Sequence, residues 1–461
     1  MRFFPDVRGF LARGRCGRGE KRPFTTFLFW GLVFFLVLCG CGREERPNIL
    51  LVLIDTIRAD HVGCYGYHRA TTPNLDSLAE AGTRFSRVMS GSPWTLPSMT
   101  SIFTGMTERT HRARLQEKTF YGVDLDLPFL SILLSRHGYN TAAFFNVIYM
   151  SEHFNFHRGF DHFDCEGLVE LCNSRTAGQT VDALLSWLDG REEDEPFFVA
   201  IHFFDPHATY DPPAPYDTIW TDPAYDGRFD SEWGMRSDMD DANSGVITVD
   251  SAGVRNLVNL YDGELAYTDA QLGRLMQALR AKGLANTTLV IVIGDHGEEF
   301  ADHGKFAHGH TLHAELLQVP LILAGCGVRQ GRVDTMLVSN IDIMPTVLSA
   351  ARVEVPDELS GRNLLSPSDR SVRTLPASGL GSSLRACVRR LDTKVIWDAD
   401  TDSSYMYDQA SDSMEMEPLR PDSALLAKVL EYWATPPEGK PDPVPWTNAV
   451  EQELRDLGYV R

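Results

Sequence analysis

NILLVLI, at residues 48–54, is a continuous apolar run of strand length, and Asp55 follows it directly. Runs that are apolar on both faces are typical of central strands in a parallel sheet that helices cover on both sides. Three further runs have the same character: FFVAIHFF at 197–204, TLVIVI at 288–293 and VPLILA at 319–324. We therefore predict a sheet whose central strands are fully buried.

Amphipathic helices are predicted between these strands, because apolar residues recur with helical spacing over residues 181–188 and again over 272–279. Strands that alternate with helices predict an α/β fold with a mainly parallel sheet flanked by helices. The pattern changes after about residue 355, where short antiparallel strands and two helices, at 425–433 and 449–457, are expected. We therefore predict a large α/β domain at 46–352 and a small α+β C-terminal subdomain at 353–461.

The charge of the chain limits its partners. Its 461 residues carry a formal net charge of −20 at pH 7. Because phosphate backbones attract basic surfaces, this charge argues against a nucleic-acid partner. An anionic substrate must instead be held locally, by a metal ion or by a few placed cations.

The first 41 residues are predicted to be an export signal. A basic segment with seven Arg or Lys residues at 1–22 precedes an apolar run of fifteen residues at 24–38. This run is shorter than the roughly 20 residues that a membrane-spanning helix needs. Residues 38–41, LCGC, resemble the lipobox of bacterial lipoproteins, so cleavage before Cys41 would leave a diacylated thiol that anchors the chain to a membrane. The alternative is an uncleaved N-terminal membrane anchor.

Both alternatives place the rest of the chain in the cell envelope, outside the cytoplasm. Gly42 follows Cys41, so the aspartate that signals inner-membrane retention is absent. In a cell with two membranes we therefore expect outer-membrane attachment, facing the periplasm or the exterior. An oxidising compartment would also allow a disulfide between Cys165 and Cys172, which are close in sequence.

Polar residues follow three of the predicted strands directly: Asp55, Asp205 and the pair Asp295-His296. Ligands of open α/β sheets gather at the carboxyl ends of the strands. A salt bridge to Arg58 or a helix N-cap is the alternative role for Asp55. Two strand ends that deliver two aspartates and a histidine to one edge predict a site for one divalent metal ion. Ca²⁺ or Mg²⁺ is favoured, and Mn²⁺ and Zn²⁺ are alternatives.

Hydroxyl groups and histidines lie close to these strand ends in sequence. The segment SPWTLPS at 92–98 opens a helix predicted over 98–104, where free backbone N–H groups would favour an alkoxide and an anionic substrate. A helix cap is the commoner role for such hydroxyls. Imidazoles can protonate a leaving oxygen or bind an anion. Six of the fourteen histidines follow two of the strands, at His202, His207, His303, His308, His310 and His313.

Taken in order, these segments resemble motifs of the sulfatase family within the alkaline-phosphatase superfamily. The matching segments are PNILLVLIDTIRADHVGCYG at 47–66, TTPNLDSLAEAGTRF at 71–85, SPWTLPSMTSIFTG at 92–105, GFDHF at 159–163, FFDPHATYDPP at 203–213, YDGELAYTDAQLG at 261–273, GDHGEEF at 294–300, residues 308–322 and VSNIDIMPTVL at 338–348. The resemblance implies a sulfatase-like catalytic domain at 46–352.

The resemblance also implies roles for individual residues. Asp55, Asp295 and His296 would ligate the metal ion. Thr95 would occupy the nucleophile position and would also touch the ion.

Histidines and cations would complete the site. His207 matches the family's substrate-binding histidine. His308 or His310 would face the leaving group as a cation or an acid. Arg58 and Lys305 are the candidate substrate-binding cations.

Three positions depart from the family pattern. The family's nucleophile motif is Cys or Ser, then any residue, then Pro-Ser-Arg, whereas this chain has Thr95 at the nucleophile and Met99 at the arginine. A threonine cannot be converted to the formylglycine of sulfatases. Thr56 stands at the second aspartate of the first strand, and FFNVIY at 144–149 lacks the usual lysine.

The leading hypothesis is a metal-dependent hydrolase that cleaves small or glycan-like sulfate or phosphate esters through Thr95. Related phosphodiesterases and phosphoethanolamine transferases use a threonine alkoxide on a metal, which favours phosphate esters. A phosphodiesterase or a phosphoethanolamine-type transferase is therefore one alternative. A catalytically inactive surface binding protein is the alternative from another class, and the lost Cys, Asp and Arg motivate it.

Overall fold

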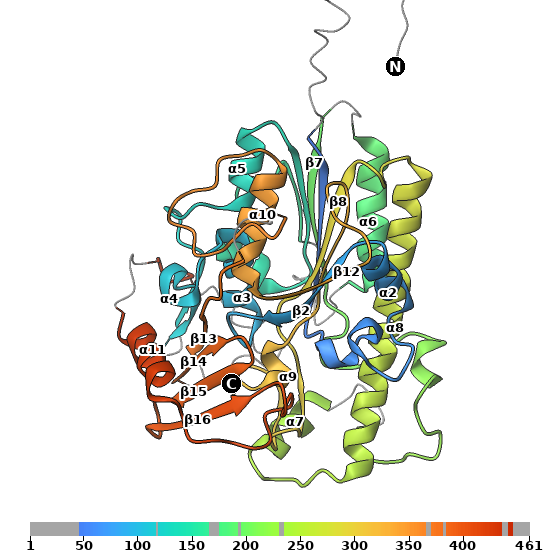
Figure 1. The fold of residues 1–461 in the computed structure, drawn as a ribbon. Coiled ribbons are helices and arrows are strands. Elements are labelled where there is room, and N and C mark those ends of the chain that lie inside the picture. Colours follow the sequence, from blue (N-terminus) through green and yellow to red (C-terminus); the bar gives the residue numbers. More distant parts are fainter. Residues whose placement is uncertain are drawn as a thin grey trace, which may run out of the picture. The chain divides into compact units, whose positions relative to one another are not determined.

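Eight strands of the described chain form the central sheet, in the order β12-β2-β11-β8-β1-β7-β5-β6 (Figure 1). The computed structural model describes residues 46–116, 119–165, 175–191, 195–229, 235–365, 370–380, 384–435 and 441–445. The export signal with Cys41, the cysteine Cys172 and the helix predicted at 449–457 lie outside these residues.

The sheet is mainly parallel, as predicted. Its strands are β1 (Asn48–Ile54), β2 (Thr83–Met89), β5 (Asn140–Phe144), β6 (His162–Asp164), β7 (Phe197–Phe203), β8 (Thr288–Gly294), β11 (Leu321–Gly325) and β12 (Arg332–Ser339). Strand β1 lies between β7 and β8 and is parallel to both. Every neighbouring pair is parallel except the two pairs that include β11.

The antiparallel direction of β11 follows from how the chain reaches it. A parallel return from β8 would need a crossover to the opposite end of the sheet. The connection at 295–320 instead holds only the two-residue strands β9 (Glu299–Phe300) and β10 (Phe306–Ala307) and the short helix α9 (Ala314–Leu317). The connection therefore stays at the carboxyl end of β8, where Asp295 and His296 lie.

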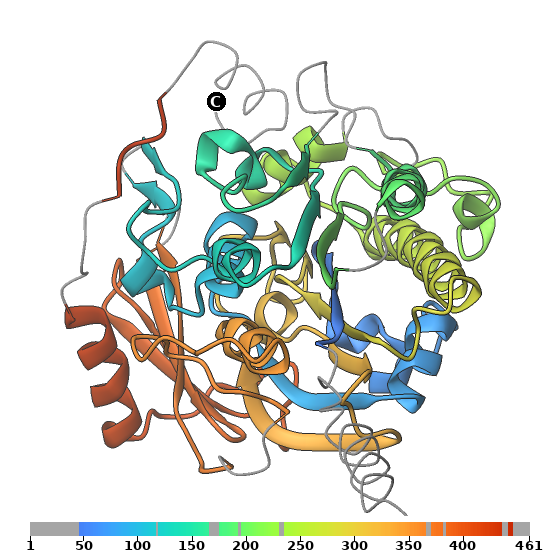
Figure 2. The ribbon, with the colours of Figure 1, turned by 90° about the horizontal axis from the view of Figure 1, so that it is seen from above.

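Helices cover both faces of the sheet (Figures 1 and 2). One face packs against α3 (Thr95–Thr104), α5 (Leu130–Arg136) and α10 (Ile343–Ala350). The other face packs against α2 (Pro73–Glu80), α6 (Ala177–Gly190) and α8 (Ser251–Ala281). The helices predicted at 181–188 and 272–279 are confirmed as parts of α6 and α8.

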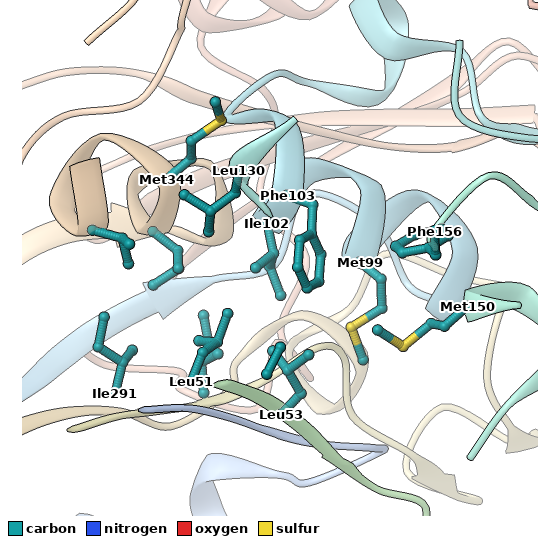
Figure 3. Packing of buried hydrophobic residues seen from close by; sticks show 14 of the residues in the cluster. Leu51, Leu53, Met99, Ile102, Phe103, Leu130, Met150, Phe156, Ile291 and Met344 are labelled. Carbon is teal, nitrogen blue, oxygen red and sulfur yellow. The ribbon is translucent and has the colours of Figure 1, made fainter. Parts of the chain in front are cut away.

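The core explains why the first strand is apolar throughout. Leu51 and Leu53 of β1 belong to the cluster that includes α3 and α10, whereas Leu50 and Val52 belong to the cluster that includes α6 and α8. Figure 3 shows the first cluster, in which side chains of α3, such as Ile102, lie over Leu51 and Leu53. Both faces of the strand are removed from water, so each position favours an apolar residue.

A smaller antiparallel sheet follows in the C-terminal part, which confirms the predicted α+β subdomain. Its strands are β13 (Leu375–Leu380), β14 (Leu384–Arg390), β15 (Thr393–Asp398) and β16 (Ser403–Asp408), and α11 (Ser423–Ala434) packs on β14 and β15. The remaining α-helices and strands of the described residues are α4 (Glu108–His111), the hairpin of β3 (Arg114–Gln116) and β4 (Thr119–Tyr121), and α7 (Met235–Asn243). None of the helices in the described ranges combines the length and the apolarity needed to cross a membrane.

Candidate active site

Two adjacent strand ends bring together the predicted metal ligands. Strands β1 and β8 run parallel with Ile54 beside Gly294, so the residues that follow each strand emerge side by side. Asp55 follows β1, and Asp295 and His296 follow β8. All three side chains are fully buried.

These three side chains form a compact group of metal-ligating atoms. One ligand atom from each residue lies within 4.8 Å of the others. The Nε2 atom of His296 lies 3.3 Å from Asp295 Oδ2 and 3.6 Å from Asp55 Oδ1. Both carboxylate oxygens of Asp55, and Oδ2 of Asp295, are buried without a hydrogen-bond partner among the described residues. Three such oxygens around one imidazole nitrogen fit a divalent cation.

The backbone prepares His296 and Asp295 for this role. The Nδ1 atom of His296 lies 2.9 Å from the carbonyl oxygen of Gly297, so Nδ1–H can donate there and leave the Nε2 lone pair facing the carboxylates. Asp295 Oδ1 accepts from the N–H groups of Thr56 and His296, at 3.2 and 2.7 Å. One oxygen of Asp295 is thereby anchored, and the other remains directed at the cluster.

The electrostatics of the cluster point to a cation as well. Burial and the adjacent charge of Asp55 raise the pKa of Asp295 well above its usual value. Burial alone would raise the pKa of Asp55, but the nearby imidazoles, above all His202, hold it below its usual value. Burial lowers the pKa of His296 to about 4, and the neighbouring His308 adds to that effect. Two carboxylates this close ionise together only beside a positive charge.

The nucleophile candidate faces the same cluster. Thr95 is the first residue of α3, it is almost fully buried, and its Oγ1 lies 3.2 Å from His296 Nε2. The helix predicted from residue 98 therefore begins three residues earlier, and Thr95 lies inside its first turn, where free backbone N–H groups are available.

Ser98 ties the start of α3 to the metal cluster. Its hydroxyl donates to the carbonyl oxygen of Asp295 at 2.7 Å, so it does not cap the helix. The Asn340 side chain donates to Ser98 Oγ at 2.9 Å and accepts from Gly91 N–H at 3.1 Å. These fully buried contacts hold Thr95 in register with the end of β8.

Two of the predicted histidines border the cluster. The ring centroid of His308 lies 4.4 Å from that of His296 and 5.1 Å from that of His207. His308 Nδ1 lies 2.9 Å from Glu298 Oε1. The other oxygen of Glu298 accepts from Tyr210 OH at 2.9 Å, which fixes the carboxylate behind the histidine.

The remaining predicted residues do not join this group. His310 Nε2 lies 2.7 Å from Glu299 Oε2, and its side chain is about a quarter exposed. Lys305 Nζ donates to the carbonyl oxygen of Asn243. The Arg58 guanidinium pairs with the carboxylates of Asp60 and Asp302, and its side chain is 3% exposed. The described contacts therefore pair the cationic groups of Arg58 and Lys305 with partners other than the three cluster residues.

In the sequence, His202 is one of the six histidines near two strand ends and has no specific role, whereas the fold places it beside Asp55. His202 lies on β7, opposite Leu53 of β1, and its Nε2 is 3.3 Å from Asp55 Oδ2. Its signals in the sequence were its place within an otherwise apolar strand and its membership of that group of histidines. Asp205, by contrast, accepts from Ala177 N–H at the start of α6, at 2.7 Å, and burial raises its pKa to about 6.

The departures from the family pattern have structural counterparts. The Thr56 hydroxyl donates to the carbonyl oxygen of Pro206 at 3.0 Å, so it is committed to the backbone. Met99, at the arginine position, is fully buried in the hydrophobic cluster of α3 (Figure 3). Asn146 donates to Thr180 Oγ1 and to the carbonyl oxygen of His202.

A mainly parallel sheet with an Asp-Asp-His cluster at its carboxyl edge, and a hydroxyl at a helix N-terminus facing it, is an arrangement suited to the cleavage of anionic esters. The family model described as Sulfatase matches residues 47–353. The chain belongs to the sulfatase family and is a hydrolase of ester bonds.

The chain matches curated relatives at low sequence identity but over most of its length. The chain is 24% identical to an arylsulfatase of Clostridium perfringens over 69% of this chain and 78% of that protein. It is 26% identical to human arylsulfatase K over 71% of this chain and 68% of that protein.

Solved structures share the fold. The structure of BT4656 with its substrate D-glucosamine-2-N,6-O-disulfate superposes with a TM-score of 0.69 at 21% identity, over 86% of this chain and all of that one. A phosphonate monoester hydrolase of Agrobacterium radiobacter superposes with a TM-score of 0.64 at 20% identity, over 90% of this chain and 97% of that one.

Proposed function

We propose that this chain is a metal-dependent phosphoesterase with Thr95 as its nucleophile, and that its substrates are small or glycan-like anionic esters. The observation that carries the proposal is the position of Thr95 Oγ1, 3.2 Å from His296 Nε2 and at the N-terminus of α3. The hydroxyl thereby faces both the metal-ligand cluster and the free N–H groups of the helix.

A divalent cation held by the cluster would supply the positive charge that the reaction needs. A divalent ion bound by Asp55, Asp295 and His296 would lower the pKa of the Thr95 hydroxyl and neutralise charge on the transferred group. The protein's own contribution is positioning, because Ser98 and Asn340 hold α3 against the end of β8.

The chemical step would be a double displacement. After the hydroxyl loses its proton to solvent, Thr95 Oγ1 attacks phosphorus, so the Oγ1–P bond forms as the P–O bond to the leaving group breaks. The leaving oxygen would take a proton from an imidazole N–H, and we propose His308 for this role because its ring centroid lies 4.4 Å from that of His296. Water then attacks phosphorus, the Oγ1–P bond breaks, and phosphate leaves as the threonine hydroxyl is restored.

Phosphate esters fit this residue set better than sulfate esters. A formylglycine hydrate can expel sulfate by elimination, whereas a sulfated threonine would have to await attack by water. The relatives named as arylsulfatases keep sulfate esters as the second candidate. The phosphonate monoester hydrolase among the structural neighbours is compatible with phosphorus chemistry on this fold.

A rate panel tests the proposal. Turnover of an aryl phosphate, an aryl phosphodiester and an aryl sulfate would be measured with Ca²⁺, Mg²⁺, Mn²⁺ and Zn²⁺ on the full chain in detergent. We expect a phosphate ester to turn over fastest, and Thr95→Ala to lower its rate by roughly 10³-fold or more because the nucleophile is lost. The Thr95→Ala variant should still bind the metal ion, as measured by calorimetry.

The outcomes separate the candidate functions. A Thr95→Ala rate equal to wild type would overturn the nucleophile assignment. Faster turnover of the aryl sulfate would assign the chain to sulfuryl transfer. Transfer of the group to an added alcohol in preference to water would indicate a transferase. Metal binding without turnover of any ester would favour the binding-protein alternative.

A further inference from the structure

The connection at 295–320 lies between the metal cluster and the C-terminal sheet. His308, which borders the cluster, belongs to this connection. Leu312 and Leu317 of the same connection pack in a hydrophobic cluster with Leu375, Cys387 and Ile396, which come from the C-terminal sheet. The residue that borders the cluster and the residues that contact the C-terminal sheet therefore belong to one short segment.

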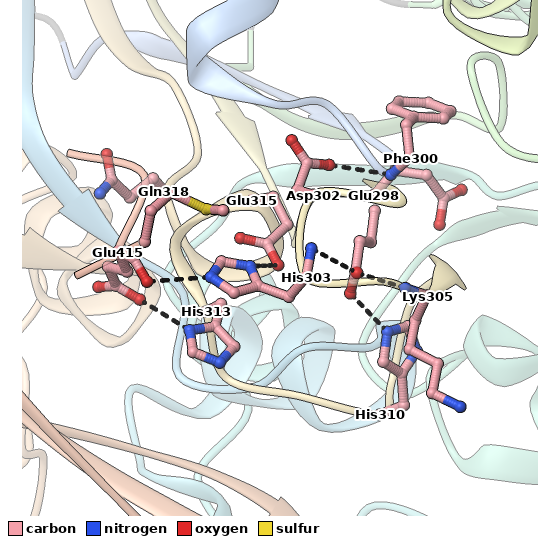
Figure 4. A network of polar contacts seen from close by, with 12 residues as sticks. Glu298, Phe300, Asp302, His303, Lys305, His310, His313, Glu315, Gln318 and Glu415 are labelled. Atoms are coloured by element: carbon pink, nitrogen blue, oxygen red, sulfur yellow. Dashed lines mark hydrogen bonds and ion pairs between the residues drawn. The ribbon is translucent and has the colours of Figure 1, made fainter. Parts of the chain in front are cut away.

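Glu415, in the loop after β16, makes the main polar contacts from the C-terminal side. Its carbonyl oxygen lies 3.0 Å from His303 Nε2, and its Oε2 lies 3.4 Å from His313 Nδ1 (Figure 4). Lys394 Nζ of β15 donates to Oε2 at 3.0 Å, and Gln409 donates to Oε1. Glu415 thus links both histidines of the connection to the C-terminal sheet.

The backbone of Glu415 is itself unusual. This residue is 1% exposed and has a φ of 59°, in the left-handed region that non-glycine residues rarely adopt. A conformation of this kind persists where the surrounding contacts over-determine it. Here that conformation allows the carbonyl oxygen and the carboxylate to contact two different histidines.

A second carboxylate, Glu299, contacts the same histidine segment from within the connection. Glu299 Oε1 accepts from the N–H groups of His303 and Lys305, at 2.9 and 2.7 Å, and Oε2 lies 2.7 Å from His310 Nε2. Arg385 of β14 donates to the carbonyl oxygen of His310. Residues 303–313 therefore contact Glu299 of the same connection and also Glu415 and Arg385 of the C-terminal part.

The acids of this network are buried and are paired with histidines and a lysine. Glu315 Oε1 lies 2.8 Å from His303 Nδ1, and the rings of His303 and His313 stack with centroids 3.8 Å apart. Burial alone would raise the pKa of Glu415, but Lys394 and His313 hold it below its usual value. A charged Glu415 is costly to bury unless both partners remain, so the contact is specific in position.

We propose that the C-terminal sheet positions the catalytic histidine segment, and that Glu415 is the positioning residue through which it acts. Glu415 touches no reacting atom. It fixes His303 and His313, which flank the segment that carries His308 and His310. The inference rests on the proposed function and deepens it. It gives the C-terminal subdomain a role in positioning the histidine that protonates the leaving group.

The test uses Glu415→Ala and Glu415→Gln in the full chain, with Glu417→Gln as a matched control. Glu417 is an exposed acid two residues away. Rates would be measured on aryl phosphates whose leaving groups differ in pKa. We expect Glu415→Ala to lower kcat by about 10- to 100-fold, because displacement of a catalytic group by about 1 Å has such effects. The loss should be larger for poorer leaving groups, which depend more on His308.

The conservative variant and the control sharpen the result. Glu415→Gln keeps the shape and the carbonyl contact, so its loss should be smaller than that of Glu415→Ala. Glu417→Gln should match wild type. Metal affinity should change by less than about twofold in all three, because the ligands Asp55, Asp295 and His296 lie outside the network. An equal loss for all leaving groups, or no loss, would overturn the proposal.

Hydrogen–deuterium exchange provides a readout that does not depend on turnover. In Glu415→Gln the amides of residues 301–313 should exchange faster than in wild type, while those of β1 and β8 stay protected. Unchanged exchange in 301–313 would overturn the positioning role even if no aryl ester is hydrolysed. If wild type hydrolyses no ester but the amides of Glu415→Gln exchange faster, the proposed function is rejected and the positioning role of Glu415 is retained. If Glu415→Ala does not fold, Glu415→Gln and Arg385→Gln carry both measurements.

Discussion

At the scale of single residues, the surroundings of Asp55 differ from what its position in the sequence indicated. A salt bridge to Arg58 was the alternative role for this aspartate, but Arg58 pairs with Asp60 and Asp302. His202 lies beside it instead, with Nε2 3.3 Å from Oδ2. Oδ1 remains on the side of His296, at 3.6 Å from its Nε2. Such a partner can orient a ligating carboxylate.

We expect His202→Gln to weaken metal binding by about 10- to 100-fold, the usual effect of losing a group that orients a metal ligand. Calorimetric titration of the chain with Mn²⁺ measures the affinity directly, without reference to catalysis. His162→Gln, which changes an exposed histidine on β6, serves as the control. A His202→Gln affinity within twofold of the control would show that His202 does not support the site.

At the scale of elements, the connection between β8 and β11 concentrates the chemistry. Because this connection returns antiparallel, it never leaves the carboxyl edge of the sheet. It therefore carries the proposed metal ligand His296, the histidine His308 and the buried acids Glu298, Glu299 and Glu315. A crossover connection would have led the chain to the opposite end of the sheet.

The stability of this element should depend on pH through His303. Burial would lower its pKa, but the hydrogen bonds to Glu315 and to the Glu415 carbonyl raise it to about 9. The charged and titratable groups that face it are Glu299, Glu315, Glu415 and the stacked His313, with Lys394 behind Glu415. A raised folded-state pKa stabilises fully below the unfolded value of about 6.5 and loses that contribution as pH rises to about 9.

Urea unfolding at pH 6, 7, 8 and 9 measures this contribution. The free energy of unfolding of wild type should decline across that range, and His303→Gln should remove part of the decline because glutamine does not titrate. Equal slopes for wild type and His303→Gln would assign the pH dependence to other groups.

At the scale of the whole molecule, we propose that the hydrolase is held at the cell envelope through a lipid on Cys41. The proposal rests on the basic segment, the short apolar run and the LCGC sequence, all within residues 1–41. We expect Cys41→Ser to prevent diacylation and to move the protein from the detergent phase to the aqueous phase in a cloud-point partition. Mass spectrometry of the mature N-terminus provides the control. Detergent partition of Cys41→Ser with an intact residue 1 would favour the uncleaved anchor.

Much of the fold and the metal cluster could be predicted from the sequence, because their signals are local. The runs at 48–54 and 288–293 are apolar because they are buried on both faces, and each is followed within two residues by a carboxylate. Parallel neighbours end at the same edge, so Asp55 and Asp295 had to meet. The ordered motifs over residues 47–353 carry the family assignment in the same way.

The partners of these residues could be found only in three dimensions. His202 lies more than a hundred residues from Asp55 in the sequence, and Glu415 lies more than a hundred residues from His303. Side-chain direction also has no local signature, which is why Lys305 turns to Asn243 and His308 to the metal cluster. The sequence thus specified which strands end in acids, whereas packing between distant segments determined which imidazoles and carboxylates act on them.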